Sequence, residues 1–386
     1  MDQAIVVPDE AQPTKSASRA AALLAAGVVA SAASAADDDP SALFVLGDSL
    51  SDVGNAAAVG DFLLGQPFYP EHTVGLCNPA DPYLLGHGCA DILFRQSRVS
   101  DGPVAVEHLA DHLGLPDLVP SFHIVPQRPV TGTVYAVASA KARDDGLEGL
   151  ARQLDMLLLD HGPLLPADAA YVVMIGGNDA IDALQAELLP SLDEPTETDA
   201  ADPDAEASAS ADEILAAAVA AVADAADRLV EAGAGCVIVA NIPSLAALPA
   251  VRAAATEAGV EEAEALARAE AVSAELNERL AAALAAVAAE HPGAIVPFDL
   301  HALIEDARAA AAADGRNATR ACFDSETYRA SPVAERVFDP ACAPEEGSVP
   351  RFDEFFFWDG LHPTGAAHAA LGAGLVDAFE QGCRAR

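Results

Sequence analysis

Short apolar runs alternate along the chain with longer segments of helical periodicity. Five of these runs are short and apolar enough to form buried strands: residues 42–46, 134–138, 170–175, 235–240 and 294–298. Helical patterns lie between them, over residues 103–113, 147–160, 211–232 and 250–290. Strands separated by helices need crossover connections, which make the strands parallel and cover both faces of the sheet. The pattern therefore predicts an α/β fold, a three-layer α/β/α sandwich with a central, mostly parallel sheet.

Two kinds of segment interrupt this alternation. Residues 189–212 are acidic and rich in proline and serine, which predicts a solvated loop. Residues 60–100 and 315–352 are rich in loop-forming residues and contain four of the six cysteines. We therefore expect a single domain over residues 40–386 that carries an acidic insertion around residues 189–212.

The N-terminal segment carries a signal for export. Lys15 and Arg19 precede an uncharged run, residues 20–36, that contains the small-x-small pattern Ala33-Ser34-Ala35. Residues 1–36 are therefore predicted to be a signal peptide, which implies a secreted or periplasmic protein. The acidic residues ahead of Lys15 are unusual in a signal peptide, so a disordered, alanine-rich leader is the alternative.

The charge balance limits the class of partner. The chain has 20 Lys and Arg against 60 Asp and Glu, a formal net charge of −40. A field of this sign repels phosphate backbones, so we expect no nucleic-acid partner. Beyond the N-terminal segment no uninterrupted apolar stretch is long enough to span a bilayer, so we expect no stable membrane insertion. The oligomeric state is left open.

The cysteines fit an oxidising compartment. Cys77 and Cys89 lie close together in the sequence, as do Cys322 and Cys342, and each pair is predicted to form a disulfide within a long loop. Cys236 lies in an apolar run and is interpreted as a small buried hydrophobe. The full connectivity stays open. None of the cysteines has C-x-x-C spacing with histidines, so we expect no zinc site.

The first candidate site follows the apolar run at residues 42–46. A strand ending at Gly47 would present Asp48 and Ser49 on a turn before a helix. A hydroxyl in that position can act as a nucleophile, with backbone N–H groups near it to hold an oxyanion. The alternative is that Asp48 or Ser49 caps the helix. The G-x-S-x-G elbow of α/β-hydrolases is absent here.

Two further sites follow other apolar segments. Gly176 and Gly177 precede Asn178, whose amide can donate to an oxyanion, although Gly-Gly-Asn-Asp is also good turn chemistry. Asp359 and His362 are three residues apart after an aromatic cluster. That spacing lets the carboxylate reach Nδ1 of the imidazole while Nε2 faces outward as a base.

Together the three blocks resemble the GDSL lipase/esterase family of the SGNH hydrolase superfamily, and the F-W-D-x-x-H-P-T form looks most like its bacterial secreted lipases, phospholipases and acyltransferases. The resemblance implies that Ser49 is the nucleophile, His362 the general base and Asp359 its orienting carboxylate. It also implies an oxyanion hole made by the Ser49 N–H, the Asn178 side chain and the N–H of Ser139, where family members often have glycine. The expected substrate is a small-molecule or lipid ester, with no metal and no organic cofactor.

Several alternatives stay open within this interpretation. The reaction could be acyl transfer to an alcohol or removal of acetyl groups from carbohydrate, and a non-catalytic binding protein of the same fold is the rival class. The departure at Ser139 is the feature that favours the rival. Lys141 and Arg143 could receive an anionic group or be solvated charges. One apolar cluster hints at a site for an acyl chain: Phe62, Leu63, Leu64, Phe68 and Tyr69.

Overall fold

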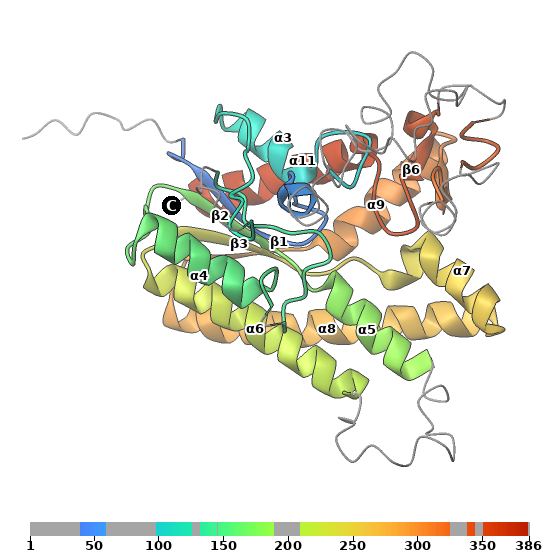
Figure 1. Cartoon of the computed structure of the whole chain (residues 1–386), viewed down its shortest axis with the longest axis horizontal. Helices are drawn as coiled ribbons and strands as arrows, with labels where there is room; N and C mark the ends of the chain where they lie inside the picture. The colour runs from blue at the N-terminus through green and yellow to red at the C-terminus, as the bar shows by residue number, and fades with distance from the viewer. Residues whose placement is uncertain are drawn as a thin grey trace, which may run out of the picture. The chain divides into compact units, whose positions relative to one another are not determined.

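A sheet of four parallel strands lies between two groups of helices (Figure 1). The structure is a computed structural model and describes residues 39–58, 98–125, 132–144, 146–188, 209–324, 338–343 and 350–384. The strands follow the chain order β1-β2-β3-β4: β1 (Leu43–Gly47), β2 (Ala170–Met174), β3 (Cys236–Ala240) and β4 (Ile295–Phe298). Apart from Pro297 in β4, their apolar side chains are buried because helices cover both faces of the sheet.

The helices form the two outer layers that the sequence predicted. One face is covered by α4 (Leu150–His161), α5 (Gly177–Leu188), α6 (Ala211–Glu231) and α8 (Glu262–Glu290). The other is covered by α3 (Ala105–His112), α9 (Leu300–Ala313) and α11 (Gly365–Phe379) (Figure 1). The three-layer α/β/α sandwich is thus confirmed.

One predicted helix is two helices. The pattern over residues 250–290 divides into α7 (Pro249–Ala258) and α8, and the break follows Gly259, whose φ of 67° is left-handed. Glycine adopts that conformation without a steric penalty, so it ends α7. The interruption matters because residues before α7 and residues on α8 meet beside the candidate site.

The predicted strand over residues 134–138 is wrong. This segment runs along β1 and makes bridge-type contacts such as Tyr135 N–H to Val45 O, 2.7 Å. On its other side, Val134 accepts from the Ser121 N–H at 2.8 Å, and the Asn55 amide binds the carbonyls of Val134 and Ala136 at 2.8 and 2.9 Å. The apolar pattern correctly indicated burial, but it did not reveal that backbone pairing here is limited to isolated bridges and supplemented by a side chain.

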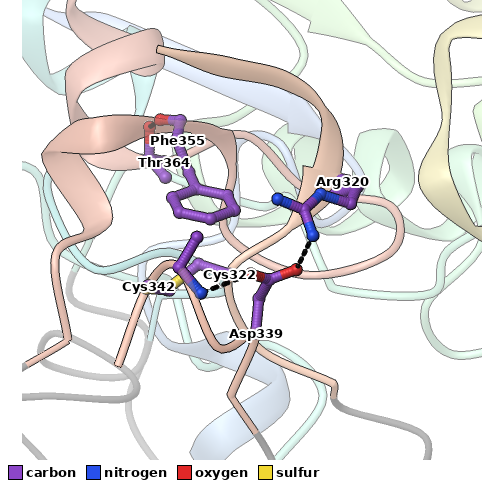
Figure 2. Close-up of a disulfide and its surroundings, with 7 residues drawn as sticks. Arg320, Cys322, Asp339, Cys342, Phe355 and Thr364 are labelled. Carbon is purple, nitrogen blue, oxygen red and sulfur yellow. Dashed lines mark hydrogen bonds and ion pairs between the residues drawn. A yellow bond between two sulfur atoms is a disulfide. The ribbon is translucent and has the colours of Figure 1, made fainter. Parts of the chain in front are cut away.

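A second, two-stranded sheet packs beside α9. It pairs β5 (Asn317–Ala321) with β6 (Phe355–Phe357), and the short helix η4 (Phe352–Glu354) precedes β6. Cys322 and Cys342 form a disulfide next to it, as predicted, and the ion pair between Arg320 and Asp339 lies at the same turn (Figure 2). The disulfide lies in a buried aromatic cluster that includes Phe323, Phe355 and Trp358.

Cys236 is the cysteine that the sequence misassigned. It is buried at the start of β3, but it is bonded to Cys383 in the C-terminal turn η5 (Glu380–Arg384). The two residues are 147 positions apart, so no local pattern marked the pair. Cys77 and Cys89 lie outside the described residues.

Several other predicted segments also lie outside the described residues. These are the leader at residues 1–36, the apolar cluster at residues 62–69 and most of the acidic insertion. Residues 211–212, which the sequence assigned both to the insertion and to the helix over residues 211–232, belong to α6, and Ser210 caps that helix. Across the described ranges no helix is both long and apolar enough to cross a bilayer.

Candidate active site

The carboxyl ends of the parallel strands bring the predicted residues to one edge of the sheet. β1 and β2 are paired with Gly47 opposite Met174, and the next backbone N–H, that of Asp48, donates to Met174 O. A Cβ on Gly47 would lie 2.5 Å from that carbonyl oxygen, so glycine is required here. The turns after β1 and β2 therefore lie side by side, which is where α/β proteins place their functional groups.

Ser49, His362 and Asp359 form one chain of polar contacts. Ser49 Oγ lies 2.9 Å from His362 Nε2, and His362 Nδ1 lies 2.8 Å from Asp359 Oδ1. The backbone N–H groups of Leu361 and His362 also donate to Asp359 Oδ1. Burial acts to raise the pKa of Asp359, but the charge of His362 and these hydrogen bonds outweigh it, so the pKa lies below its ordinary value. The structure thus brings together a hydroxyl, an imidazole and an ionised carboxylate in the predicted order.

Asp48 is a second buried carboxyl at this edge, for which the sequence predicted no role beyond a helix cap. It is 4% exposed, and its Oδ1 accepts one hydrogen bond, from the Leu50 N–H. Burial raises its pKa to about 7, although Leu50 and the charge of His362 act in the opposite direction. Two buried carboxyls with opposed pKa shifts therefore lie at this edge of the sheet, and the charge of His362 lowers the pKa of both.

Asn178 follows β2, as predicted, and lies in the first turn of α5, a helix that the sequence pattern did not predict. One N–H of its amide donates to Ala140 O at 2.9 Å. A primary amide has two N–H groups, so the second remains for another acceptor. Ser49, Asn178 and His362 all line the same cavity.

Ser139 is less directly placed. It is exposed, and it is not among the residues that line the cavity next to Ser49. Its φ of 69° is left-handed, the backbone conformation that glycine adopts most easily. Its neighbours tie the segment to the site, since Ala138 N–H donates to Asp52 and Ala140 O accepts from Asn178.

Two polar residues that the sequence did not single out organise the turn after β1. The Asp52 carboxylate accepts backbone N–H groups from both sides of the site: Gly54, Asn55, Ala56 and Ala138. The Asn55 side chain bonds Val134, Ala136 and the Phe122 N–H. Both were visible in the motif after Ser49 as turn-forming residues, but their long-range partners were not.

Lys141 and Arg143 are both engaged by acids. Lys141 Nζ lies 2.6 Å from Asp182, and Arg143 pairs with Asp182 and with the fully buried Asp179. Both cations therefore offset local acidity, as the second alternative held, although their side chains are partly buried rather than freely solvated. They fix the segment after Ser139 to α5.

A small, mostly apolar cavity lies next to Ser49, with a volume of about 50 Å³. Its polar side is formed by Asp48, Ser49, Asn178 and His362. Its apolar side comes chiefly from the loop after β3, the start of α9 and α5. In the part of the chain that the structure describes, no three His, Cys, Asp or Glu residues are grouped to hold a metal ion.

A parallel sheet with a Ser–His–Asp chain of contacts at its carboxyl edge is an arrangement found in serine hydrolases. A family model for GDSL-like lipases/acylhydrolases matches residues 43–375, and the chain belongs to that family. No curated protein matches the sequence. Membership indicates an ester or acyl hydrolase, in agreement with the resemblance carried by the three sequence blocks.

Proposed function

We propose that the protein hydrolyses carboxylic esters of small molecules or lipids through a covalent acyl-enzyme on Ser49. The observation that carries the proposal is the 2.9 Å contact between Ser49 Oγ and His362 Nε2, with Asp359 on the opposite ring nitrogen. A nucleophile, a base and an orienting carboxylate within hydrogen-bond distance are what acyl transfer requires.

The reaction proceeds in two halves. His362 Nε2 takes the proton of Ser49 as Oγ attacks the ester carbonyl, and Asp359 stabilises the imidazolium that forms. The oxyanion accepts hydrogen bonds from the Ser49 N–H, the second N–H of Asn178 and the N–H of Ser139. Collapse of the intermediate breaks the bond to the alkoxy oxygen, and His362 returns the proton to the departing alcohol. Water then attacks the acyl-enzyme by the same route and releases the acid.

We further propose that the protein acts outside the cytoplasm, secreted or periplasmic. Two cysteine pairs at disulfide distance support this, since disulfides persist in oxidising compartments. The small-x-small pattern of the N-terminal segment is the second support.

The test compares hydrolysis of p-nitrophenyl acetate by the wild-type protein and by Ser49→Ala. We expect kcat/KM to fall by a factor of at least about 10⁴, because the nucleophile and base act as a unit. Ser51→Ala is the matched control, since Ser51 is a buried serine two residues away whose hydroxyl makes no hydrogen bond to the described residues. An inert but folded wild-type protein would favour a non-catalytic binding protein instead.

A further inference from the structure

The cavity beside Ser49 has a graded wall. Leu245 and Leu300 are 1% exposed and Leu248 is 6% exposed, whereas Ile181 and Leu361 are half-buried. Ile242 and Met174, at 2% and 3% exposed, line the cavity as well. The most buried part of the wall is therefore apolar, and the three leucines belong to it.

One polar side chain, Asn241, lies on the apolar side of the cavity. One N–H of its amide donates to Asp299 and its Oδ1 accepts from the His301 N–H, at 2.8 and 2.9 Å. These two hydrogen bonds hold the amide in place, and the other lining residues on this side are apolar, so most of the wall is matched to hydrocarbon.

Side chains of α8 hold the loop that forms this wall. Asn277 binds both the N–H and the C=O of Ile242, each at 2.9 Å. Ser273 Oγ accepts from the Leu245 N–H at 2.9 Å, and Glu270 accepts from the Ser244 hydroxyl. The spacing of these three polar residues along α8 places them on one helix face. These hydrogen bonds therefore hold the loop after β3, which pairs with no strand, in place beside Ser49.

We infer that this cavity is the acyl site, that it takes a short apolar acyl group, and that Leu245, Leu248 and Leu300 limit its length. The inference rests on the proposed ester hydrolysis and deepens it. The volume is about 50 Å³. An apolar cavity of about 150 Å³ accommodates the six carbons of benzene, so by proportion roughly two carbons fit here.

The experiment measures kcat/KM for p-nitrophenyl acetate, butyrate and octanoate. The wild-type protein is expected to lose at least about tenfold between butyrate and octanoate, the order of discrimination that a small apolar pocket gives. Leu248→Ala removes part of the buried wall and is expected to raise the octanoate-to-butyrate ratio about tenfold. Leu284→Ala removes an equally buried leucine of α8 that does not line the cavity, and its ratio is expected to match the wild type.

A second variant tests whether the hydrogen bonds from α8 to the loop after β3 matter, without changing any side chain that lines the cavity. Asn277→Ala frees the backbone of Ile242, and it is expected to flatten the chain-length profile chiefly through KM rather than kcat. Circular dichroism confirms folding of all variants. Asn277 is a positioning residue, and an unchanged profile in the folded Asn277→Ala protein would remove it from the inference.

The outcomes distinguish the acyl-site inference from the proposed ester hydrolysis. If the wild type hydrolyses octanoate as well as butyrate, and Ser49→Ala abolishes both activities, the acyl-site inference is overturned while the ester hydrolase stands. An equal shift in Leu248→Ala and Leu284→Ala also overturns the acyl site. A folded wild-type protein inert toward all three esters overturns both.

Discussion

Asp48 connects the candidate site to stability through its proton. Its pKa in the folded protein is about 7 because it is buried, against 3.8 for an ordinary aspartate. A raised pKa means that the folded state holds the proton more tightly than the unfolded state. Stability is therefore lost as the pH rises from about 4 to 7, and no more is lost above 7. The charged form is the one that burial disfavours.

Asp48→Asn removes that ionisation while keeping the shape of the side chain. Relative to the wild type, the variant is expected to gain about 3 kcal/mol of unfolding free energy between pH 5 and pH 8. Urea unfolding at the two pH values measures the difference, with the exposed Asp117→Asn as the baseline. A difference between the Asp48 variant and the wild type that does not change with pH would contradict the raised pKa.

Ser139 carries backbone strain that glycine would relieve. A left-handed conformation costs an L-residue about 1–2 kcal/mol. Glycine avoids this cost, but part of the gain in stability is lost because glycine has more conformational entropy in the unfolded state. Ser139→Gly is therefore expected to stabilise the protein by about 0.5–1 kcal/mol, measured by urea unfolding. Ser139→Ala retains the Cβ and should show no gain. Equal stability of the glycine and alanine variants would indicate that φ is not the cause.

The disulfide between Cys322 and Cys342 lies beside Phe355 (Figure 2), and we expect it to brace the segment that runs on to Asp359 and His362. Cys322 N–H donates to Phe357 O at 3.0 Å, and Phe323 N–H donates to Trp358 O at 2.8 Å. The residue after Trp358 is Asp359, so loosening this pairing disturbs the support of His362. The disulfide itself, which closes a loop of 20 residues, is worth about 3 kcal/mol.

Replacing both Cys322 and Cys342 by alanine is expected to lower kcat as well as stability. The matched control replaces Cys236 and Cys383, because Cys236 lies at the amino end of β3, at the edge of the sheet opposite Ser49. That pair should lose stability and retain its kcat at 25 °C. Thermal unfolding and p-nitrophenyl acetate turnover measure the two quantities. If the two double variants lost kcat equally, the bracing role would be refuted.

How much of the fold could be predicted depends on how far apart along the chain the interacting residues lie. The four sheet strands and most helices were predictable because burial and helical periodicity are local properties. The break at Gly259 was missed because alanine-rich sequence continues the helical pattern on both sides of it. The false strand at residues 134–138 and the disulfide of Cys236 depend on partners about 80 and 147 residues away.

The candidate site divides in the same way. Ser49, Asn178, Asp359 and His362 were found because each follows a strand or a turn in a recognisable block. Asp48 was visible but its burial was not, since burial depends on how β1 and β2 are paired. The cavity wall was missed entirely, because the α8 side chains that hold it are polar residues in an otherwise ordinary helix.

The net charge of −40 should make the stability of the whole chain depend on salt. Like charges repel most in the compact state, whereas exposed ion pairs such as that of Arg268 and Glu264 contribute only about 0–1 kcal/mol each. Screening shortens the Debye length from about 10 Å at 0.1 M salt to about 3 Å at 1 M, and it relieves the repulsion more than it weakens the pairs. The midpoint of thermal unfolding is therefore expected to rise by several degrees between 0.1 and 1 M NaCl. At pH 4, where carboxylates are partly protonated, the rise should shrink. A midpoint that falls with NaCl at pH 7 would show that the ion pairs outweigh the net charge.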